Sequence, residues 1–190
     1  MNRMELKEII DGERQIYYLS KNKKKFICQI THNKRYMIWK YIYYFRMYQY
    51  WNAIFLSKSG IEKVACKLIS YYYMRRKNII GEKCNIEIAN GCSLGKNINI
   101  YHGGVIISSA KIGNNCTIRG NTVIGNKGLK KYNGEPAIGN NVEIGAGANI
   151  IGNITIADGC EIGANSVVTK SILEPNSIVV GVPGRIVERK

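Results

Sequence analysis

Residues 144–168 read IGAGANIIGNITIADGCEIGANSVV, and within them an aliphatic residue returns at every sixth position. A period of six fits neither an α-helix nor an alternating strand, but it fits short strands that point one side chain inward between tight corners. We therefore predict triangular coils of three strands, stacked at the inter-strand spacing of about 4.8 Å. The aliphatic residues in this register are Ile88, Leu94, Ile100, Ile106, Ile112, Ile118, Ile124, Ile138, Ile144, Ile150, Ile156, Ile162 and Val168.

The position two residues before each of these aliphatics is mostly small, and we expect it to lie inside the coil beside them. It holds Cys92, Ile98, Gly104, Ala110, Cys116, Thr122, Val142, Ala148, Ile154, Cys160 and Ser166. Buried free cysteine behaves as a small hydrophobic residue, so the cysteines at this position are expected to be core residues. The six cysteines form no Cys-x-x-Cys pair and only two histidines are present, so we predict no metal site.

The positive charge of the chain is concentrated before the repeat. The net charge is +15, and residues 1–80 contain 17 Lys and Arg against 5 Asp and Glu. Both tryptophans, all three phenylalanines and 11 of the 13 tyrosines lie in the same part. We therefore predict two parts: a basic, aromatic-rich helical region over residues 1–79, and a β-helix domain over residues 80–190 with an excursion loop at 125–137 and a C-terminal tail.

Within the first part, residues 35–56 read RYMIWKYIYYFRMYQYWNAIFL and carry an aromatic stripe at helical spacing. A second helix is expected from about residue 60 to residue 76. Amphipathic helices of this kind can cap the first coil of a solenoid, and an alternative role is peripheral contact with an anionic membrane surface. The sequence shows neither a signal peptide nor a membrane-spanning stretch, and its free cysteines suit a reducing compartment. We expect a cytoplasmic protein, with the inner face of the cell membrane as a second possibility. The aromatic stripe is Met37, Tyr41, Tyr44, Tyr48, Trp51 and Phe55.

The repeat resembles the hexapeptide-repeat acyltransferases in three stretches that together cover roughly residues 80–190. These are the unit IGNNCT at 112–117, the run at 144–168, and the ending SIVVGVPGRIV at 177–187. Within that superfamily the chain is most similar to serine acetyltransferases and to the O-acetyltransferases of bacterial surface polysaccharides. The resemblance implies a left-handed parallel β-helix, a homotrimer with active sites between adjacent subunits, and acetyl-CoA as co-substrate.

Two histidines could supply the base that acetyl transfer to a hydroxyl needs. His32 lies outside the repeat among lysines and is interpreted as a surface or packing residue. His102 lies two places after Ile100, where a side chain should point outward at a corner, and two glycines follow it. In the resembling enzymes the catalytic histidine occupies this place, here within IYHGGVII. The resemblance therefore assigns the catalytic base to His102.

The same enzymes orient their histidine with an acidic residue whose position corresponds to Glu87. A carboxylate there would hold the ring and stabilise the imidazolium that forms. An exposed glutamate without a role at the edge of a coil is the alternative interpretation.

The acceptor site departs from the serine acetyltransferase pattern. Tyr101 replaces an aspartate that helps to bind the amino acid, and residues 133–136 replace a basic pair. The segment after His102 also keeps the plain six-residue spacing, whereas those enzymes lengthen it by two residues. These departures favour a sugar hydroxyl as acceptor.

Ligand contacts are expected in the loop and along the later coils. Acceptor or phosphate contacts are predicted for Tyr101, Lys127, Lys130, Lys131, Tyr132 and Glu135. Small residues should line a groove for the pantetheine arm, with basic residues near its end for the nucleotide phosphates. The coenzyme A candidates are Ala146, Gly147, Ala164, Arg185, Arg189 and Lys190.

We therefore predict an acetyl-CoA-dependent O-acetyltransferase that modifies a sugar of a capsule, lipopolysaccharide or exopolysaccharide. Serine O-acetylation and amino-sugar N-acetylation are the enzymatic alternatives. The charge and the tyrosines also suggest a basic nucleic-acid-binding module, but no nucleic-acid motif accompanies them, so we expect no nucleic acid partner.

Overall fold

The computed structural model describes residues 2–17, 34–128 and 134–189. It divides into two compact units, Met1–Asn85 and Ile86–Lys190. The sequence placed the division near residue 80, and it falls later because the last helix runs on to Cys84. That helix was expected to end near Arg76. It ends instead at Cys84 and is capped by Asn85, which has a left-handed backbone (φ 54°) and donates its N–H to the carbonyls of Gly81 and Glu82.

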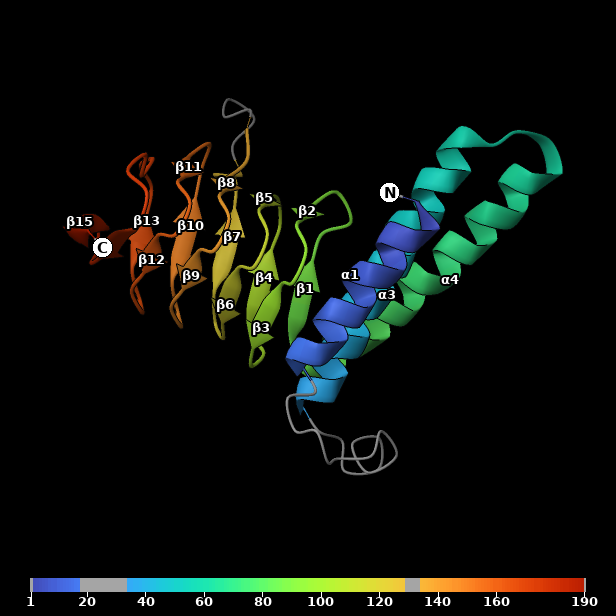
Figure 1. Cartoon of the computed structure of the whole chain (residues 1–190), viewed down its shortest axis with the longest axis horizontal. Coiled ribbons are helices and arrows are strands. Elements are labelled where there is room, and N and C mark those ends of the chain that lie inside the picture. The colour runs from blue at the N-terminus through green and yellow to red at the C-terminus, as the bar shows by residue number, and fades with distance from the viewer. Residues whose placement is uncertain (1, 18–33, 129–133, 190) are drawn as a thin grey trace. The chain divides into compact units, whose positions relative to one another are not determined.

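The first unit contains the helices α1 (Arg3–Tyr17), α3 (Lys34–Ser57) and α4 (Gly60–Cys84), labelled in Figure 1. The buried face of α3 carries Ile38, Tyr41, Ile42 and Phe45 at helical spacing. The predicted aromatic stripe is therefore not the buried face, since Tyr41 is its one buried member. The difference arises because α3 packs against both α1 and α4, so two sides of the helix are partly covered.

Two positive charges of this unit lie in its core. Arg46 on α3 is 2% exposed and forms a bidentate ion pair with Glu13 of α1, with Nε to Oε2 at 3.3 Å and Nη2 to Oε1 at 2.5 Å. Lys77 on α4 is 4% exposed, and its Nζ lies 5.7 Å from the Phe45 ring centroid, within cation–π range. Part of the N-terminal charge is therefore structural. Among the described helices, none combines the length and the apolar character needed to cross a membrane.

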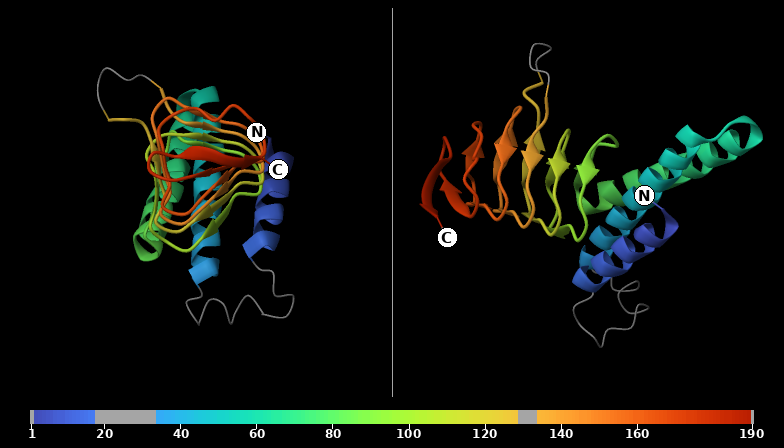
Figure 2. Two further views of the ribbon diagram at one scale, coloured as in Figure 1. Left: turned by 90° about the vertical axis from the view of Figure 1, so that its left-hand side faces the viewer. Right: turned by 45° about the horizontal axis from the view of Figure 1, so that its top comes forward.

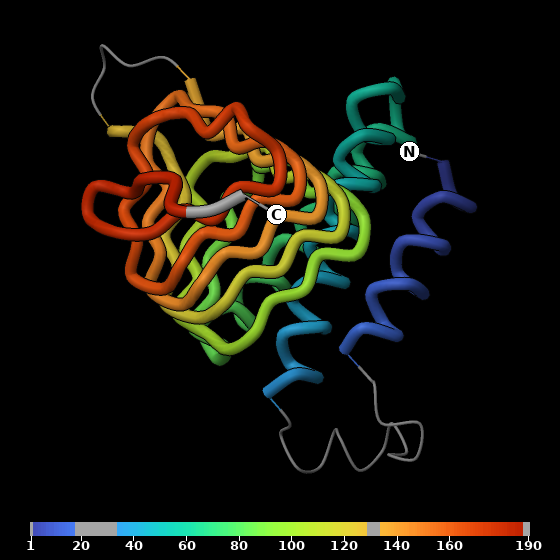
Figure 3. Tube along the Cα trace, turned by 60° about the vertical axis from the view of Figure 1, so that its left-hand side comes forward, coloured from blue at the N-terminus to red at the C-terminus, as the bar shows by residue number. Residues whose placement is uncertain are grey.

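The second unit is a parallel β-helix with three faces, whose stacked coils are seen nearly end-on in the left view of Figure 2 and in Figure 3. Face A contains β1 (Ile86–Ile88), β4 (Val105–Ile107), β7 (Val123–Gly125), β10 (Asn149–Ile151) and β13 (Val167–Val168). Face B contains β2 (Ser93–Leu94), β5 (Lys111–Ile112), β8 (Ala137–Ile138) and β11 (Thr155–Ile156). Face C contains β3 (Asn99–Tyr101), β6 (Thr117–Arg119), β9 (Glu143–Ile144), β12 (Glu161–Ile162), β14 (Ser177–Val180) and the antiparallel β15 (Arg185–Arg189). The predicted left-handed parallel β-helix is confirmed.

The interior follows the six-residue repeat closely. Of the thirteen aliphatics predicted to point inward, twelve are buried, and the exception is Ile106. The three cysteines predicted as core residues, Cys92, Cys116 and Cys160, are at most 2% exposed. Burial raises the pKa of the Cys116 and Cys160 thiols above its ordinary value, because the thiolate would be poorly solvated. These thiols belong to the hydrophobic core, as predicted.

The exception lies in β4, where the register is shifted by one residue. Ile106 is 43% exposed, whereas Val105 and Ile107 are fully buried. The predicted register would have placed Gly104 and Ile106 inside. The observed register buries two branched aliphatics in place of one, and each fully buried aliphatic side chain stabilises the core by about 1.5–3 kcal/mol.

This shift changes the lengths of two corners in one coil. Four residues, 101–104, separate the inward Ile100 from the inward Val105, and two residues, Ser108 and Ser109, separate Ile107 from Ala110. The other regular corners have three. The predicted plain six-residue spacing after His102 is therefore wrong: that corner gains a residue and the next corner loses one.

The excursion loop leaves the stack between β7 and β8, at the corner that joins face A to face B (Figure 3). Its returning end is tied to the preceding coil by Glu135, which accepts a 2.6 Å hydrogen bond from Ser109 Oγ and lies 3.5 Å from Lys111 Nζ. Glu135 therefore braces the base of the loop. Lys130, Lys131 and Tyr132 lie outside the described residues.

Candidate active site

His102 occupies an unusual backbone position at the corner between β3 and β4. It is exposed, and its φ of +69° lies in the left-handed region. The seven other non-glycine residues with positive φ in the described chain are all asparagine. This conformation costs an ordinary L-residue roughly 1–2 kcal/mol, and such strain gathers at functional sites. The corner therefore holds a histidine where asparagine would be less strained.

The backbone around His102 is closely packed against the next coil. Gly103 O accepts a 3.1 Å hydrogen bond from Asn121 N. A Cβ at Gly120 would lie 2.8 Å from Gly103 O and 3.1 Å from His102 Cβ, so only glycine fits against this corner without displacement. Gly104 has a φ of +81°, which an L side chain rarely adopts. These contacts fix the direction in which the imidazole leaves the coil.

An open groove with a volume of about 600 Å³ lies beside His102 on the outer side of face C. Its lining residues come from the His102 corner, from β6 and from β9, and they are mostly polar. They are Tyr101, His102, Gly103, Thr117, Arg119, Gly120, Asn121, Glu143 and Ala146. We call this the histidine groove.

A second groove of about 280 Å³ continues toward the C-terminal coils. It shares Arg119, Glu143 and Ala146 with the histidine groove. Its remaining lining residues are Gly145, Glu161, Ile162, Gly163, Ala164 and Ile178, so small and aliphatic residues form most of it. We call it the small-residue groove. The two grooves therefore adjoin at these three shared residues, and the first of them lies beside the imidazole.

The junction between the grooves holds an ion pair that the sequence did not suggest. Arg119 Nη2 lies 3.4 Å from Glu143 Oε2, and both side chains are about half exposed, at 56% and 53%. Arg119 follows the inward Ile118 and Glu143 precedes the inward Ile144, so both point outward on face C. The sequence signal for both residues was their outward position beside an inward aliphatic. Arg119 and Glu143 are nevertheless 24 residues apart in the sequence, because the excursion loop lies between them.

Glu87 does not contact His102 in the described structure. It lies exposed on the outer side of β1, paired in register with Ile106 on face A. The His102 corner leads directly into β4, so the carboxylate belongs to the strand beside the one that follows the histidine. Among the described hydrogen bonds and ion pairs, none joins the two side chains. The orienting role of Glu87 stays a prediction.

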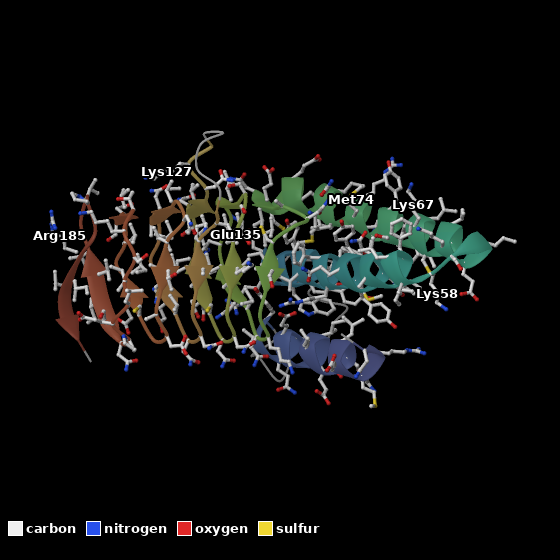
Figure 4. All side chains as sticks on the ribbon, turned by 90° about the horizontal axis from the view of Figure 1, so that it is seen from above. Lys58, Lys67, Met74, Lys127, Glu135 and Arg185 are labelled. Carbon is white, nitrogen blue, oxygen red and sulfur yellow. The ribbon has the colours of Figure 1, made fainter. Side chains whose placement is uncertain are left out.

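The structure brings some of the predicted coenzyme A residues to the grooves. Ala146 lines both grooves and Ala164 lines the second. Gly147 lines neither; its N–H donates a 2.9 Å hydrogen bond to Gly120 O, which supports the stack. Arg185 is exposed on β15, labelled in Figure 4, and pairs with Val180 of β14. The Arg189 side chain and Lys190 lie outside the described part.

Of the predicted loop contacts, the two that the structure describes, Lys127 and Glu135, are not brought to His102 within one chain. Lys127 and Glu135, labelled in Figure 4, belong to the corner between faces A and B. His102 belongs to the corner between faces C and A. Within the described ranges, no group of three His, Cys, Asp or Glu residues could hold a metal ion.

Comparison with known proteins agrees with this architecture. The family described as bacterial transferase hexapeptide (six repeats) matches residues 136–170. No curated protein matches the chain. Among solved structures, serine acetyltransferase from Neisseria gonorrhoeae shares 26% identity with a TM-score of 0.70, covering 98% of this chain and 68% of that one.

Two further solved structures carry ligands in their descriptions. The serine acetyltransferase of Brucella abortus strain S19 in complex with coenzyme A is 26% identical, with a TM-score of 0.69 and coverage of 98% and 69%. The Neisseria gonorrhoeae enzyme in complex with serine is 25% identical, with a TM-score of 0.68 and coverage of 98% and 70%. With its hexapeptide repeat and its similarity to these enzymes over nearly its whole length, the chain is an acyltransferase of the left-handed β-helix superfamily.

Proposed function

We propose that this chain transfers an acetyl group from acetyl-CoA to a hydroxyl, with His102 as the general base. The observation that carries the proposal is the meeting of two grooves beside an exposed imidazole. One groove is lined mainly by polar residue types, as an acceptor with hydroxyls would require. The other has a smaller volume and is lined mainly by small and aliphatic residues, which suits an extended, uncharged arm.

In the proposed reaction the acceptor oxygen attacks the thioester carbonyl carbon directly, while His102 takes the hydroxyl proton. The tetrahedral intermediate then collapses, the carbon–sulfur bond breaks, and the imidazolium returns its proton to the coenzyme A sulfur. The products are an acetyl ester and free coenzyme A. Glu87 would act as a positioning residue that stabilises the imidazolium.

The proposed donor site is the small-residue groove. Ala146 and Ala164 leave room for the pantetheine arm, and Ile178 of β14 lies at the far end. Arg185, on the strand paired with β14, would meet the nucleotide phosphates there. The coenzyme A complex of the Brucella relative supports this donor.

L-Serine is the first acceptor to test, because the similar solved structures are serine acetyltransferases and one of them is a complex with serine. The histidine groove offers both charges that an amino acid requires, with Arg119 and Glu143 in its lining.

A sugar hydroxyl of a bacterial surface polysaccharide is the second candidate, and Tyr101 favours it. This residue lines the groove, is 37% exposed, and stands directly before His102, where the resemblance expects aspartate. An aromatic ring offers a sugar a flat apolar face in addition to a hydroxyl.

We further propose that the enzyme is a homotrimer in which the excursion loop of one copy reaches His102 of the next. The support is the separation of the two corners within one chain, together with the resemblance to trimeric acyltransferases. Lys127 would then contribute to the acceptor side of a neighbouring site.

The first test replaces His102 by asparagine. Asparagine holds the left-handed conformation at seven described positions of this chain, so His102→Asn should retain the fold and the melting temperature. Loss of the general base should lower kcat about 100-fold or more. The measurement is coenzyme A release from acetyl-CoA with L-serine or a panel of saccharides, and His102→Ala serves as a second variant. Undiminished turnover in His102→Asn would refute the assignment of the base.

A further inference from the structure

We infer that Arg119 binds a carboxylate of the acceptor and so determines which hydroxyl compounds this enzyme accepts. The inference rests on the proposed acetyl transfer and deepens it, because it names the chemical class of the acceptor. Neither the resemblance nor the repeat pattern pointed to this residue.

Arg119 stands next to the reacting centre. On face C its β6 position pairs in register with Tyr101 of β3, and the residues that follow the two are Gly120 and His102. Gly120 lies against the His102 Cβ. On the next strand the residue opposite Arg119 is Gly145, which has no side chain, so the neighbour of the guanidinium on that side is the half-exposed Glu143. A ligand in the histidine groove can therefore reach the guanidinium and the imidazole together.

Arg119 is also the one Lys or Arg among the described residues that line either groove. The other charged lining residues are Glu143 and Glu161, which face each other in register on β9 and β12. An anionic ligand would be repelled by those carboxylates everywhere except beside Arg119. Planar guanidinium also matches a carboxylate with two parallel hydrogen bonds.

The donor does not supply this anion. The pantetheine arm is uncharged near the thioester, and its phosphates lie at the opposite end of the coenzyme. In the proposed arrangement the arm leaves the junction along the small-residue groove, away from the histidine groove. An anion beside Arg119 must therefore come from the acceptor.

The existing ion pair with Glu143 does not prevent this binding. Its shortest N–O distance is 3.4 Å and both side chains are about half exposed, and ion pairs between exposed side chains contribute little. A bidentate, charge-assisted contact with a ligand carboxylate is stronger. Glu143 is then displaced, or it receives a positive group of the acceptor such as an ammonium.

A competing role for Arg119 is stabilisation of the thioester oxygen as it becomes negative. The two roles differ in what they change. A carboxylate anchor affects the KM of acidic acceptors alone, whereas an oxyanion donor affects kcat for every acceptor.

The test compares acceptors that differ only in the carboxylate: L-serine with L-serinamide, and D-glucuronate with D-glucose. In Arg119→Gln, KM for the carboxylate member of the active pair should rise about 10–100-fold, the range expected for a lost hydrogen bond to a charged group. KM for the neutral member and for acetyl-CoA should be unchanged. Arg119→Lys, which keeps the charge and loses the paired geometry, should fall between.

Two further variants sharpen the comparison. Lys170→Gln removes an exposed cation of the same unit that lines neither groove, so it controls for net charge and should match wild type. Glu143→Gln removes the competing carboxylate and should lower KM for D-glucuronate, which carries no ammonium group. Thermal melts of all variants establish that they are folded.

Binding of the same four probes by calorimetry, to protein saturated with coenzyme A, separates this inference from the proposed function. Carboxylate binding that Arg119→Gln abolishes, in an enzyme that acetylates nothing, would support the inference and refute acetyl transfer. Turnover in which Arg119→Gln affects acid and amide equally, or raises KM for acetyl-CoA, would overturn the inference and leave the proposed function standing.

Discussion

The imidazole of His102 stands at a backbone position that other corners of this β-helix give to asparagine. Three of those asparagines form hydrogen bonds along the stack: Asn97 Nδ2 donates to Asn115 Oδ1 at 2.9 Å, and Asn115 Nδ2 donates to Asn141 Oδ1 at 3.1 Å. His102 has no equivalent ladder among the described hydrogen bonds. Its side chain is therefore free to face the groove, which is what a base requires.

The glycine beneath His102 gives a sharp test at this scale. In Gly120→Ala the new Cβ would meet Gly103 O at 2.8 Å and His102 Cβ at 3.1 Å, so the corner must shift. We expect kcat to fall about 10–100-fold, because misplacing a catalytic group by about 1 Å can cost about 100-fold.

Overpacking of this kind should also lower the unfolding free energy by about 1–3 kcal/mol. Gly91→Ala is the matched control, since nothing lies within 4 Å of its Cβ position. Kinetics and urea unfolding of the two variants are the measurements. Equal kcat values in both would mean that the Gly120 contact does not position His102.

Prediction from the sequence succeeded for single residues whose role follows from the repeat. The outward, glycine-flanked placement of His102 and the burial of Cys116 are examples. It missed Arg119 and Glu143, because neighbours across strands are one coil apart in space and the loop adds residues between them. Thr117 pairs with Glu143 over 26 residues, whereas Asn99 pairs with Thr117 over 18.

At the scale of elements, β4 is where sequence and structure differ most. Three consecutive β-branched aliphatics, Val105, Ile106 and Ile107, leave a period of six unable to decide which of them point inward. In the structure, Val105 and Ile107 are buried and fill both interior positions of the coil. The helices show a similar limit: α3 and α4 were predicted and α1 was not, and their ends and buried faces depend on tertiary packing.

The register of β4 is tested by a pair of truncations. Ile107→Ala removes a fully buried side chain and should cost about 2–5 kcal/mol of unfolding free energy. Ile106→Ala removes a side chain that is 43% exposed and should cost much less. Chemical denaturation of both variants is the measurement. The opposite ranking would restore the register that a strict six-residue count implies.

At the scale of the whole molecule, the excess positive charge and the proposed reaction site belong to different units. Three basic side chains near the helix connection and on α4, Lys58, Lys67 and Arg76, lie in the first unit, and the first two are labelled in Figure 4. The grooves lie wholly in the second unit. The composition indicated this division, but it could not show that Arg46 and Lys77 are core residues.

The proposed trimer is tested by mass and by complementation. Light scattering coupled to gel filtration should give three times the chain mass of 21.4 kDa, about 64 kDa. Assemblies co-refolded from His102→Asn copies and Lys127→Ala copies should be more active than either variant alone, because some sites then combine an intact histidine with an intact loop.

A monomeric mass, or mixed assemblies no more active than the better variant, would place the whole site within one chain. Lys127→Ala must itself lower turnover for the complementation to be informative, and a fully active Lys127→Ala would remove that residue from the proposed site.

The corner at His102 is one residue longer than the regular corners and the next corner is one residue shorter, so the two deviations cancel within a single coil. This deviation does not show in the sequence, because an aliphatic residue still falls on every sixth position. The coils on either side keep their alignment. An insertion in a periodic core would ordinarily propagate to every later repeat. Here the three consecutive aliphatics of β4 absorb the change of register, so the corner that carries His102 is lengthened while the coils on either side stay aligned.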